Sequence, residues 1–197
     1  MALGAASLRR CLSACRWMAR VKIRGATSMD FSTVYKVSAR ADILRLARHC
    51  DGLAGTHPMP HRRDLSPAEV TWLLGRLYLI DVLDGGADYS FRLFGIFWEK
   101  MYGTDLTAQR LSEIEAAGRL TALRGDYDTV VAAREPLFHP GRLVWPNKRS
   151  IHYERLLVPF SGDDGQVSVI LAAAGCDVSL DDLVLHRGKG LPRLVLD

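Results

Sequence analysis

The sequence predicts an α+β domain in which a mainly antiparallel, five-stranded sheet carries helices on one face. Two pairs of strand-like segments, at 77–96 and 151–175, each contain a glycine-bearing turn, as β-hairpins do. Helical segments separate the two pairs, and this order favours helices packed on an antiparallel sheet. A doubly wound parallel sheet does not fit, because its strands would alternate singly with helices.

The chain of 197 residues suits one domain with extensions, and its 48% of hydrophobic residues suffices for a buried core. We expect a disordered or non-native basic extension at 1–37, a flanking helix and linker at 38–64, the domain at 65–178 and a tail at 179–197. The first 28 residues carry six basic residues and no acidic one, a composition that also describes a mitochondrial transit peptide. We favour translated upstream sequence, with a biological start at Met29 or Met18.

A helix is predicted over residues 38–50, with Gly52 and Gly55 ending it. Ile43, Leu44 and Leu46 share one side of this helix. Such an apolar stripe must be covered, either by the sheet of the same chain or by a second copy. It is therefore a candidate contact for a homodimer.

A second helix is predicted from Ser66 to about Gly75. Ser66 and Glu69 have the spacing of a capping box, in which each side chain bonds the backbone of the other. Pro67 occupies the first helical position, where its missing N–H costs nothing.

The remaining elements come in groups. The strands are rich in β-branched and aromatic residues, and glycine, proline and aspartate mark their turns. The expected strands lie at 77–83, 89–96, 136–144, 151–160 and 167–175. The expected helices lie at 97–103, 110–117 and 119–135, and Pro136 stops the last of them.

Five short motifs follow one another along the chain. They are PHRRDLSP at 60–67, YLIDV at 78–82, YSFRLFG at 89–95, GTDLT at 103–107 and LLVPFS at 156–161. The series resembles a family of short PAS-domain proteins common in alphaproteobacteria, over about residues 45–177. Ala108 departs from that pattern, which usually has glycine at this position.

The resemblance implies the PAS fold, in which a five-stranded antiparallel sheet cups its helices. It also implies a sensory or adaptor domain that acts through small-molecule binding, protein–protein docking or both. We expect no enzyme activity, because no catalytic motif is present and no kinase or cyclase fits beside the domain. The alternative is a small enzyme or binding protein that holds an anionic ligand in the same cavity through Arg92.

Alternate side chains of the strands should line the space between sheet and helices. The candidate pocket residues are Tyr89, Phe91, Arg92, Trp98, Tyr153, Arg155, Leu171 and Ala173. The small residues at 172–175 leave room for a ligand or for a closely packed helix, and we favour the helix.

Arg92 and Arg155 each have two interpretations. A guanidinium group matches a carboxylate or phosphate in a two-pronged geometry, which suits an anionic ligand. The other interpretation, which we favour, is a structural ion pair, for Arg92 with an acid such as Glu154 or Asp81.

We expect no haem, flavin or metal cofactor. Haem-binding PAS domains generally use a histidine on the long helix before the last strands, and residues 119–135 contain none. Flavin photosensors of this fold use a cysteine just after the first hairpin, and residues 97–118 contain none. The six histidines and four cysteines lack the spacing of a metal site.

Partner contacts are expected at Trp145 and at the apolar stripe of the flanking helix. The expected partners are a second copy of the chain, a signalling protein and an unknown small molecule. Residues 29–197 contain 20 basic and 22 acidic residues, so we expect no nucleic-acid partner. We also expect no membrane span. The cysteines lack disulfide spacing, so we expect the protein to lie in the reducing cytoplasm.

Overall fold

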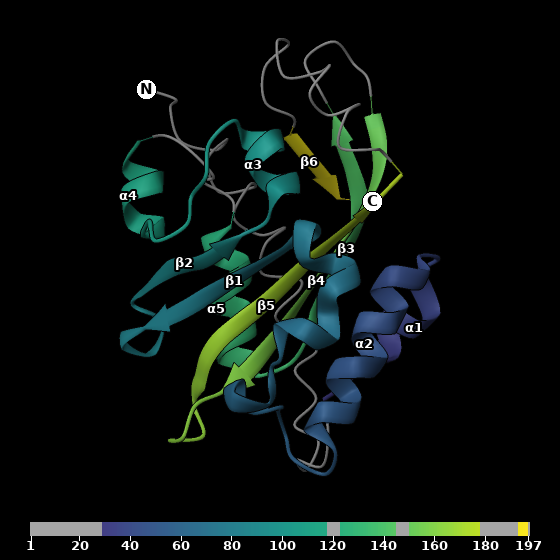
Figure 1. Cartoon of the computed structure of the whole chain (residues 1–197), viewed down its shortest axis with the longest axis vertical. Helices are drawn as coiled ribbons and strands as arrows, with labels where there is room; N and C mark the ends of the chain where they lie inside the picture. Colours follow the sequence, from purple (N-terminus) through teal and green to yellow (C-terminus); the bar gives the residue numbers. More distant parts are fainter. Residues whose placement is uncertain (1–28, 118–122, 145–149, 178–192, 197) are drawn as a thin grey trace, which may run out of the picture.

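The computed structural model describes residues 29–117, 123–144, 150–177 and 193–196. They form an antiparallel sheet with the strand order β2-β1-β5-β4-β3-β6 (Figure 1). The strands are β1 (Leu77–Leu83), β2 (Asp88–Phe94), β3 (Leu137–Val144), β4 (Ser150–Ser161), β5 (Val167–Cys176) and β6 (Arg193–Leu196). The α+β class and the five expected strands are confirmed. β6 adds a strand from the segment that we expected to be a tail, and it pairs with β3.

Two hairpins build most of the sheet. β1 and β2 are joined by the 3-10 turn η4 (Asp84–Gly86), in which Gly85 and Gly86 have positive φ angles of 69° and 106°. β4 and β5 form the second hairpin, and β1 pairs with β5 along its length. This pairing brings the first hairpin beside the second and closes the central part of the sheet.

Helices cover both faces of the sheet. Arg155 of β4 pairs with Asp126 on α5 (Arg124–Ala133), whereas its neighbour Glu154 accepts a hydrogen bond from Ser38, just before α2 (Ala41–Ala54). Successive side chains of a strand point to opposite faces, so α5 and α2 lie on opposite sides. Figure 1 shows α2 in front of the strands and α5 behind them. We refer to these two sides as the α5 face and the α2 face.

The three central helices pack as the sequence predicts. They are α3 (Ile96–Tyr102), α4 (Leu111–Ala116) and α5. α3 ends at Gly103, which has the left-handed conformation of a helix terminus, with φ of 80°. α5 begins at Arg124, and the first residues of the predicted helix lie outside the described part of the chain.

The N-terminal part of the described chain belongs to the fold. Met29, Phe31 and Val34 are buried, and α1 (Ser32–Val37) packs beside α2. The predicted boundary at residue 37 is therefore wrong, because these residues lie in the same core as the sheet. α2 also continues through Gly52, which was expected to end it, and stops at Gly55, whose φ is 56°.

The apolar stripe of α2 lies against the sheet. Ile43 and Leu46 are fully buried, and Leu44 is partly buried. In this structure the stripe is therefore covered by the chain itself, and these side chains are not available to a second copy. Trp145, the other expected contact, lies outside the described residues.

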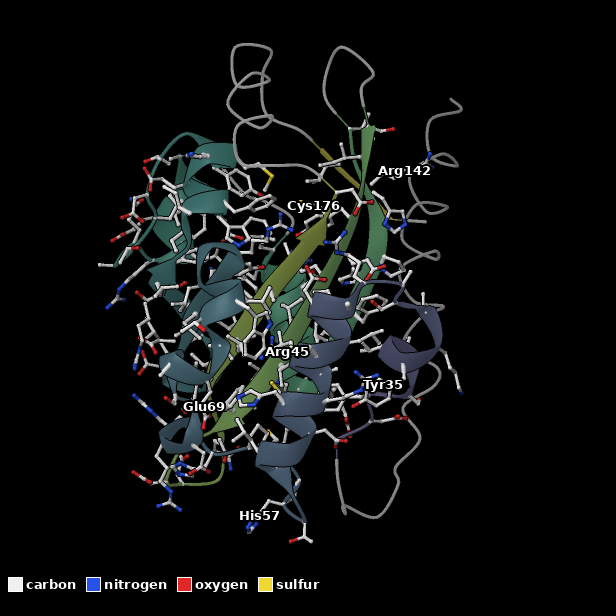
Figure 2. All side chains as sticks on the ribbon, turned by 45° about the vertical axis from the view of Figure 1, so that its right-hand side comes forward. Tyr35, Arg45, His57, Glu69, Arg142 and Cys176 are labelled. Atoms are coloured by element: carbon white, nitrogen blue, oxygen red, sulfur yellow. The ribbon has the colours of Figure 1, made fainter. Side chains whose placement is uncertain are left out.

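The helix predicted from Ser66 is the 3-10 helix η3 (Pro67–Arg76), with a break at Val70. The predicted capping box does not form, because the backbone N–H of Glu69 already donates to the carbonyl of Ser66 at 3.0 Å, as in a 3-10 turn. The guanidinium of Arg45 on α2 stacks 3.5 Å above the ring of Trp72 and so attaches η3 to α2. Figure 2 shows Arg45 and Glu69 on this side of the molecule.

Within the described residues, no helix has the length and apolar character needed to cross a membrane. Cys50 and Cys176 are buried.

Candidate ligand-binding site

A cavity lies between the sheet and α3 on the α5 face. It is lined by Tyr78, Phe91, Phe94, Trp98, Tyr102, Leu123 and Arg155. Its free volume is about 10 Å³, which is roughly the space that one water molecule needs. The cavity is therefore closed tightly around its own side chains.

The cavity wall is a cluster of aromatic rings. The ring of Tyr78 lies edge-on to that of Trp98, with centroids 4.9 Å apart. Trp98 and Tyr102 stack at an angle of 11°, with centroids 6.3 Å apart. The indole N–H of Trp98 donates to the carbonyl of Arg76 at 3.0 Å, so it fixes the ring and does not point a donor into the cavity.

Arg155 places a charge at the base of this cluster, with an exposure of 2%. Its Nη2 donates to Asp126, whose other carboxylate oxygen lies 3.1 Å from Nε2 of His139. Burial alone would lower the pKa of Arg155, but Tyr78, Tyr153 and Asp126 raise it, so the guanidinium stays charged. Its Nε–H has no hydrogen-bond acceptor among the described residues.

Three buried tyrosines lie close enough to Arg155 to act on its charge. Burial raises the pKa of Tyr78, Tyr127 and Tyr153, so all three are protonated at neutral pH. The hydroxyl of Tyr127 lies beside that of Tyr78 but forms no hydrogen bond of ordinary geometry. Buried polar groups of proteins are seldom left without a partner. The Nε–H of Arg155 and the hydroxyl of Tyr127 are therefore candidates for ligand contacts.

A family model described as a PAS domain matches residues 28–174. The chain belongs to the PAS domain family. The matched range begins before α1 and ends within β5, so it includes the N-terminal helices that cover the α2 face. No curated protein matches the chain.

Three solved structures are similar to part of the chain. The PAS domain of BvgS from Bordetella pertussis is 21% identical, with a TM-score of 0.38, over 58% of this chain and 87% of that one. A LOV protein from Rhodobacter sphaeroides is 16% identical, with a TM-score of 0.37, over 51% and 58%. An RNA-binding light-oxygen-voltage receptor is 16% identical, with a TM-score of 0.39, over 64% and 37%.

The cavity of this PAS domain does not fit haem or flavin in the conformation described. Pockets for ligands of drug size measure roughly 300–1,000 Å³, whereas the free volume here is about 10 Å³. His139 lies on the α5 face, but its Nε2 is engaged with Asp126. Within the described residues, no group of three His, Cys, Asp or Glu side chains is placed to hold a metal ion.

Five of the predicted pocket residues lie on the α5 face. Phe91, Trp98 and Arg155 line the cavity itself. Tyr153 packs edge-on against Trp98, with centroids 6.2 Å apart. Tyr89 lies further along this face, where its hydroxyl donates to Asp128 at 2.6 Å.

Arg92 does not line the cavity. It binds both oxygens of Asp81 at 2.7 and 3.0 Å, and its side chain is 45% exposed. The register of β1 and β2 shifts at this point, so Leu79 lies opposite Leu93 and Ile80 opposite Phe91. Arg92 is the extra residue of this bulge and forms a surface ion pair with Asp81, the interpretation favoured from the sequence. Its prediction as a pocket residue and the alternative of an anion clamp are wrong.

Leu171 and Ala173 lie on the α2 face, so, contrary to the prediction, neither lines the cavity beside Arg155. Leu171 instead lines a small apolar cavity on the α2 face, together with Leu74 and Leu79. Ala172 pairs with Tyr78 of β1 and shares its face, and the residues on either side of Ala172 point the other way. Every residue from Val169 to Cys176 is buried. Because helices cover both faces, no polar residue in this stretch marks one face as exposed.

Sequence reasoning missed Asp126, the partner of Arg155, and His139, which contacts the same carboxylate. His139 lies directly opposite Arg155 in the pairing of β3 with β4. Asp126 is in the first turn of α5, and it reaches Arg155 only because α5 packs across these strands. A correct register for the predicted strands would have found the histidine, but the aspartate requires the packed helix.

Proposed function

We propose that this PAS domain is a sensory signalling domain that binds a small molecule on the α5 face and has no catalytic reaction of its own. The observation that carries the proposal is the buried Nε–H of Arg155, which lacks an acceptor among the described residues, on a side chain that lines an aromatic cavity. A buried donor without a partner costs about 1–3 kcal/mol. A ligand oxygen that accepts this hydrogen would remove the cost.

Ligand entry requires α3 to move, because the closed cavity has room for about one water molecule. α3 carries two lining residues, Trp98 and Tyr102, and lies between Gly95 and Gly103. A helix of seven residues between two glycines is a small unit that can shift without breaking the sheet. Occupancy of the cavity would thus be converted into a displacement of α3.

A docking function is supported by apolar side chains at the other end of α3. Ile96, its first residue, is 40% exposed, and Leu74 of η3 is 38% exposed. Ile96 lies beside Gly75, so the two apolar side chains come from adjacent positions. We propose that this edge contacts a signalling protein or a second copy of the chain, and that displacement of α3 changes the contact.

Mass spectrometry of the natively purified protein tests small-molecule binding. We expect one bound small molecule to be released on denaturation from the wild type and from Arg92→Met, because Arg92 lies outside the cavity. The double variant Arg155→Met/Asp126→Asn, which removes both charges of the buried pair, should not carry it. A folded double variant that retains the molecule would contradict the proposal. So would a wild type that carries nothing and binds no compound of a metabolite library.

A further inference from the structure

The charges at the base of the cavity are already balanced. Arg155 pairs with Asp126, and the neighbouring hydroxyls of Tyr78, Tyr127 and Tyr153 are protonated. A carboxylate or phosphate bound here would bury a second negative charge close to Asp126. Buried charges are stable only when they are paired, so this arrangement disfavours an anionic ligand. A neutral oxygen can accept the Nε–H of Arg155 without adding charge.

The walls of the cavity favour a flat ring. Trp98 is held by its hydrogen bond to the carbonyl of Arg76 and by edge-on contacts with Tyr78 and Phe97. One face of the fixed indole stacks on Tyr102 at an angle of 11°. Aromatic rings prefer offset-stacked and edge-on contacts of this kind, and a planar ligand can form both.

Tyr102 occupies the position that such a ring would take. It lies at the end of α3, next to the left-handed Gly103, and it is partly buried. The free volume of about 10 Å³ admits no ring beside it, since that volume holds about one water molecule. We propose that the cavity binds an uncharged, planar aromatic molecule, which replaces the ring of Tyr102 against Trp98 and accepts the Nε–H of Arg155 through one oxygen. This inference rests on the proposed function and specifies its ligand class.

Four probes separate the properties of the ligand. Benzamide is uncharged and planar and has an oxygen acceptor, whereas benzoate adds a charge, cyclohexanecarboxamide lacks planarity and toluene lacks the acceptor. Binding of each probe to the full chain is measured by NMR titration. We expect benzamide to bind at least about 10-fold more tightly than each of the other three.

Substitutions test whether benzamide binds in this cavity. Tyr102→Ala should bind benzamide about 10-fold more tightly, because the competing ring is gone. Arg155→Met/Asp126→Asn should bind benzamide no better than toluene, and Arg92→Met should bind like the wild type. In the wild-type protein, benzamide should shift the Nε–H resonance of Arg155, assigned through its loss in Arg155→Lys. This last measurement does not depend on the folding of the double variant.

Each alternative outcome overturns a stated part of the inference. Tighter binding of benzoate would show an anion site. Equal binding of cyclohexanecarboxamide would show that the ligand need not be planar. Equal binding of toluene, or an unmoved Nε–H signal, would show that Arg155 does not donate to the ligand. If no probe binds the wild type or Tyr102→Ala, the inference is wrong. If native mass spectrometry then finds a ligand of another class that depends on Arg155, the sensory function stands and only the ligand class fails.

Discussion

At the scale of single residues, the ion pair of Arg155 and Asp126 has the largest consequence for stability. Arg155→Met should destabilise the protein by about 3–5 kcal/mol, because the partly buried carboxylate of Asp126 loses its arginine and keeps only His139 beside it among the described side chains. Adding Asp126→Asn removes that charge and should restore most of the loss. Urea unfolding of both variants measures the difference.

The surface ion pair of Arg92 and Asp81 is the matched control. Because Arg92 is half-exposed, Arg92→Met should change the free energy of unfolding by at most about 1 kcal/mol. A double variant at Arg155 and Asp126 that is as unstable as Arg155→Met would show that the lost packing of the guanidinium matters more than the charge left on Asp126.

The backbone conformation of Ala108 also lowers the free energy of unfolding. It adopts a φ of 65°, and its N–H donates to the carbonyl of Phe91 at 2.6 Å, which holds the strained conformation in place. A residue with a side chain loses about 1 kcal/mol in this region relative to glycine. Ala108→Gly should therefore raise the free energy of unfolding by about that amount, with an unchanged dependence on urea concentration. A lower midpoint would instead show that added freedom of the unfolded chain outweighs the relief of strain.

What the sequence reveals at this scale depends on burial. The departure of Ala108 from the family pattern was visible in the sequence, and it falls on a position with left-handed backbone. The faces of β5 were not visible, because both are covered and all residues around Leu171 are apolar. Arg92 was expected in the pocket because it lies between apolar neighbours, yet a bulge turns it towards Asp81. Side-chain direction thus fails as a prediction where a strand is irregular or buried on both sides.

At the scale of elements, the junction of β2 and α3 depends on Gly95. A Cβ at this position would lie 2.5 Å from the carbonyl oxygen of Leu77 and 2.7 Å from that of Gly75. Both atoms belong to the backbone, so they cannot move without shifting β1 or η3. Gly95→Ala should destabilise the protein by about 2 kcal/mol or more, as overpacking does.

Gly52→Ala is the control for this substitution. Gly52 lies inside α2, and its Cβ would meet no atom within 4 Å. Alanine should stabilise the helix there by about 0.4–1 kcal/mol. Thermal unfolding compares the two variants, and a neutral Gly95→Ala would show that the backbone at this junction adapts.

The five strands were predictable because glycine, proline and aspartate punctuate them. The ends of the helices were harder to predict. Glycine disfavours a helix, yet α2 includes Gly52. The contacts of Ile43 and Leu46 with the sheet outweigh the propensity of one glycine. The 3-10 form of η3 was also missed. The backbone N–H of Glu69 donates to the carbonyl of Ser66, so the capping side chains that predicted an α-helix are unused.

At the scale of the whole molecule, β4 connects the two faces. Arg155 lines the cavity on the α5 face, and its neighbour Glu154 accepts a hydrogen bond from Ser38, just before α2. The small residue Gly175 lies opposite Glu154 and allows Arg40 and Ile43 to pack closely against the sheet. The small run at 172–175 therefore permits close helix packing, the interpretation favoured from the sequence. Whether α2 would cover its own sheet or a second copy depended on contacts distant in sequence, which no local pattern specifies.

The boundary of the domain gives a final prediction. Met29, Phe31 and Val34 are buried in the same core as the sheet, so a chain that begins at Met29 should keep the unfolding temperature of the full chain. A chain that begins at Leu65 loses α1 and α2 and exposes the apolar α2 face, including Leu156 and Val158. Large exposed apolar patches promote association, so this shorter chain should aggregate or unfold. Light scattering and thermal unfolding distinguish the two chains. A stable monomer that begins at Leu65 would mean that α1 and α2 only rest on the sheet, and it would move the edge of the folded unit back to where the sequence first placed it.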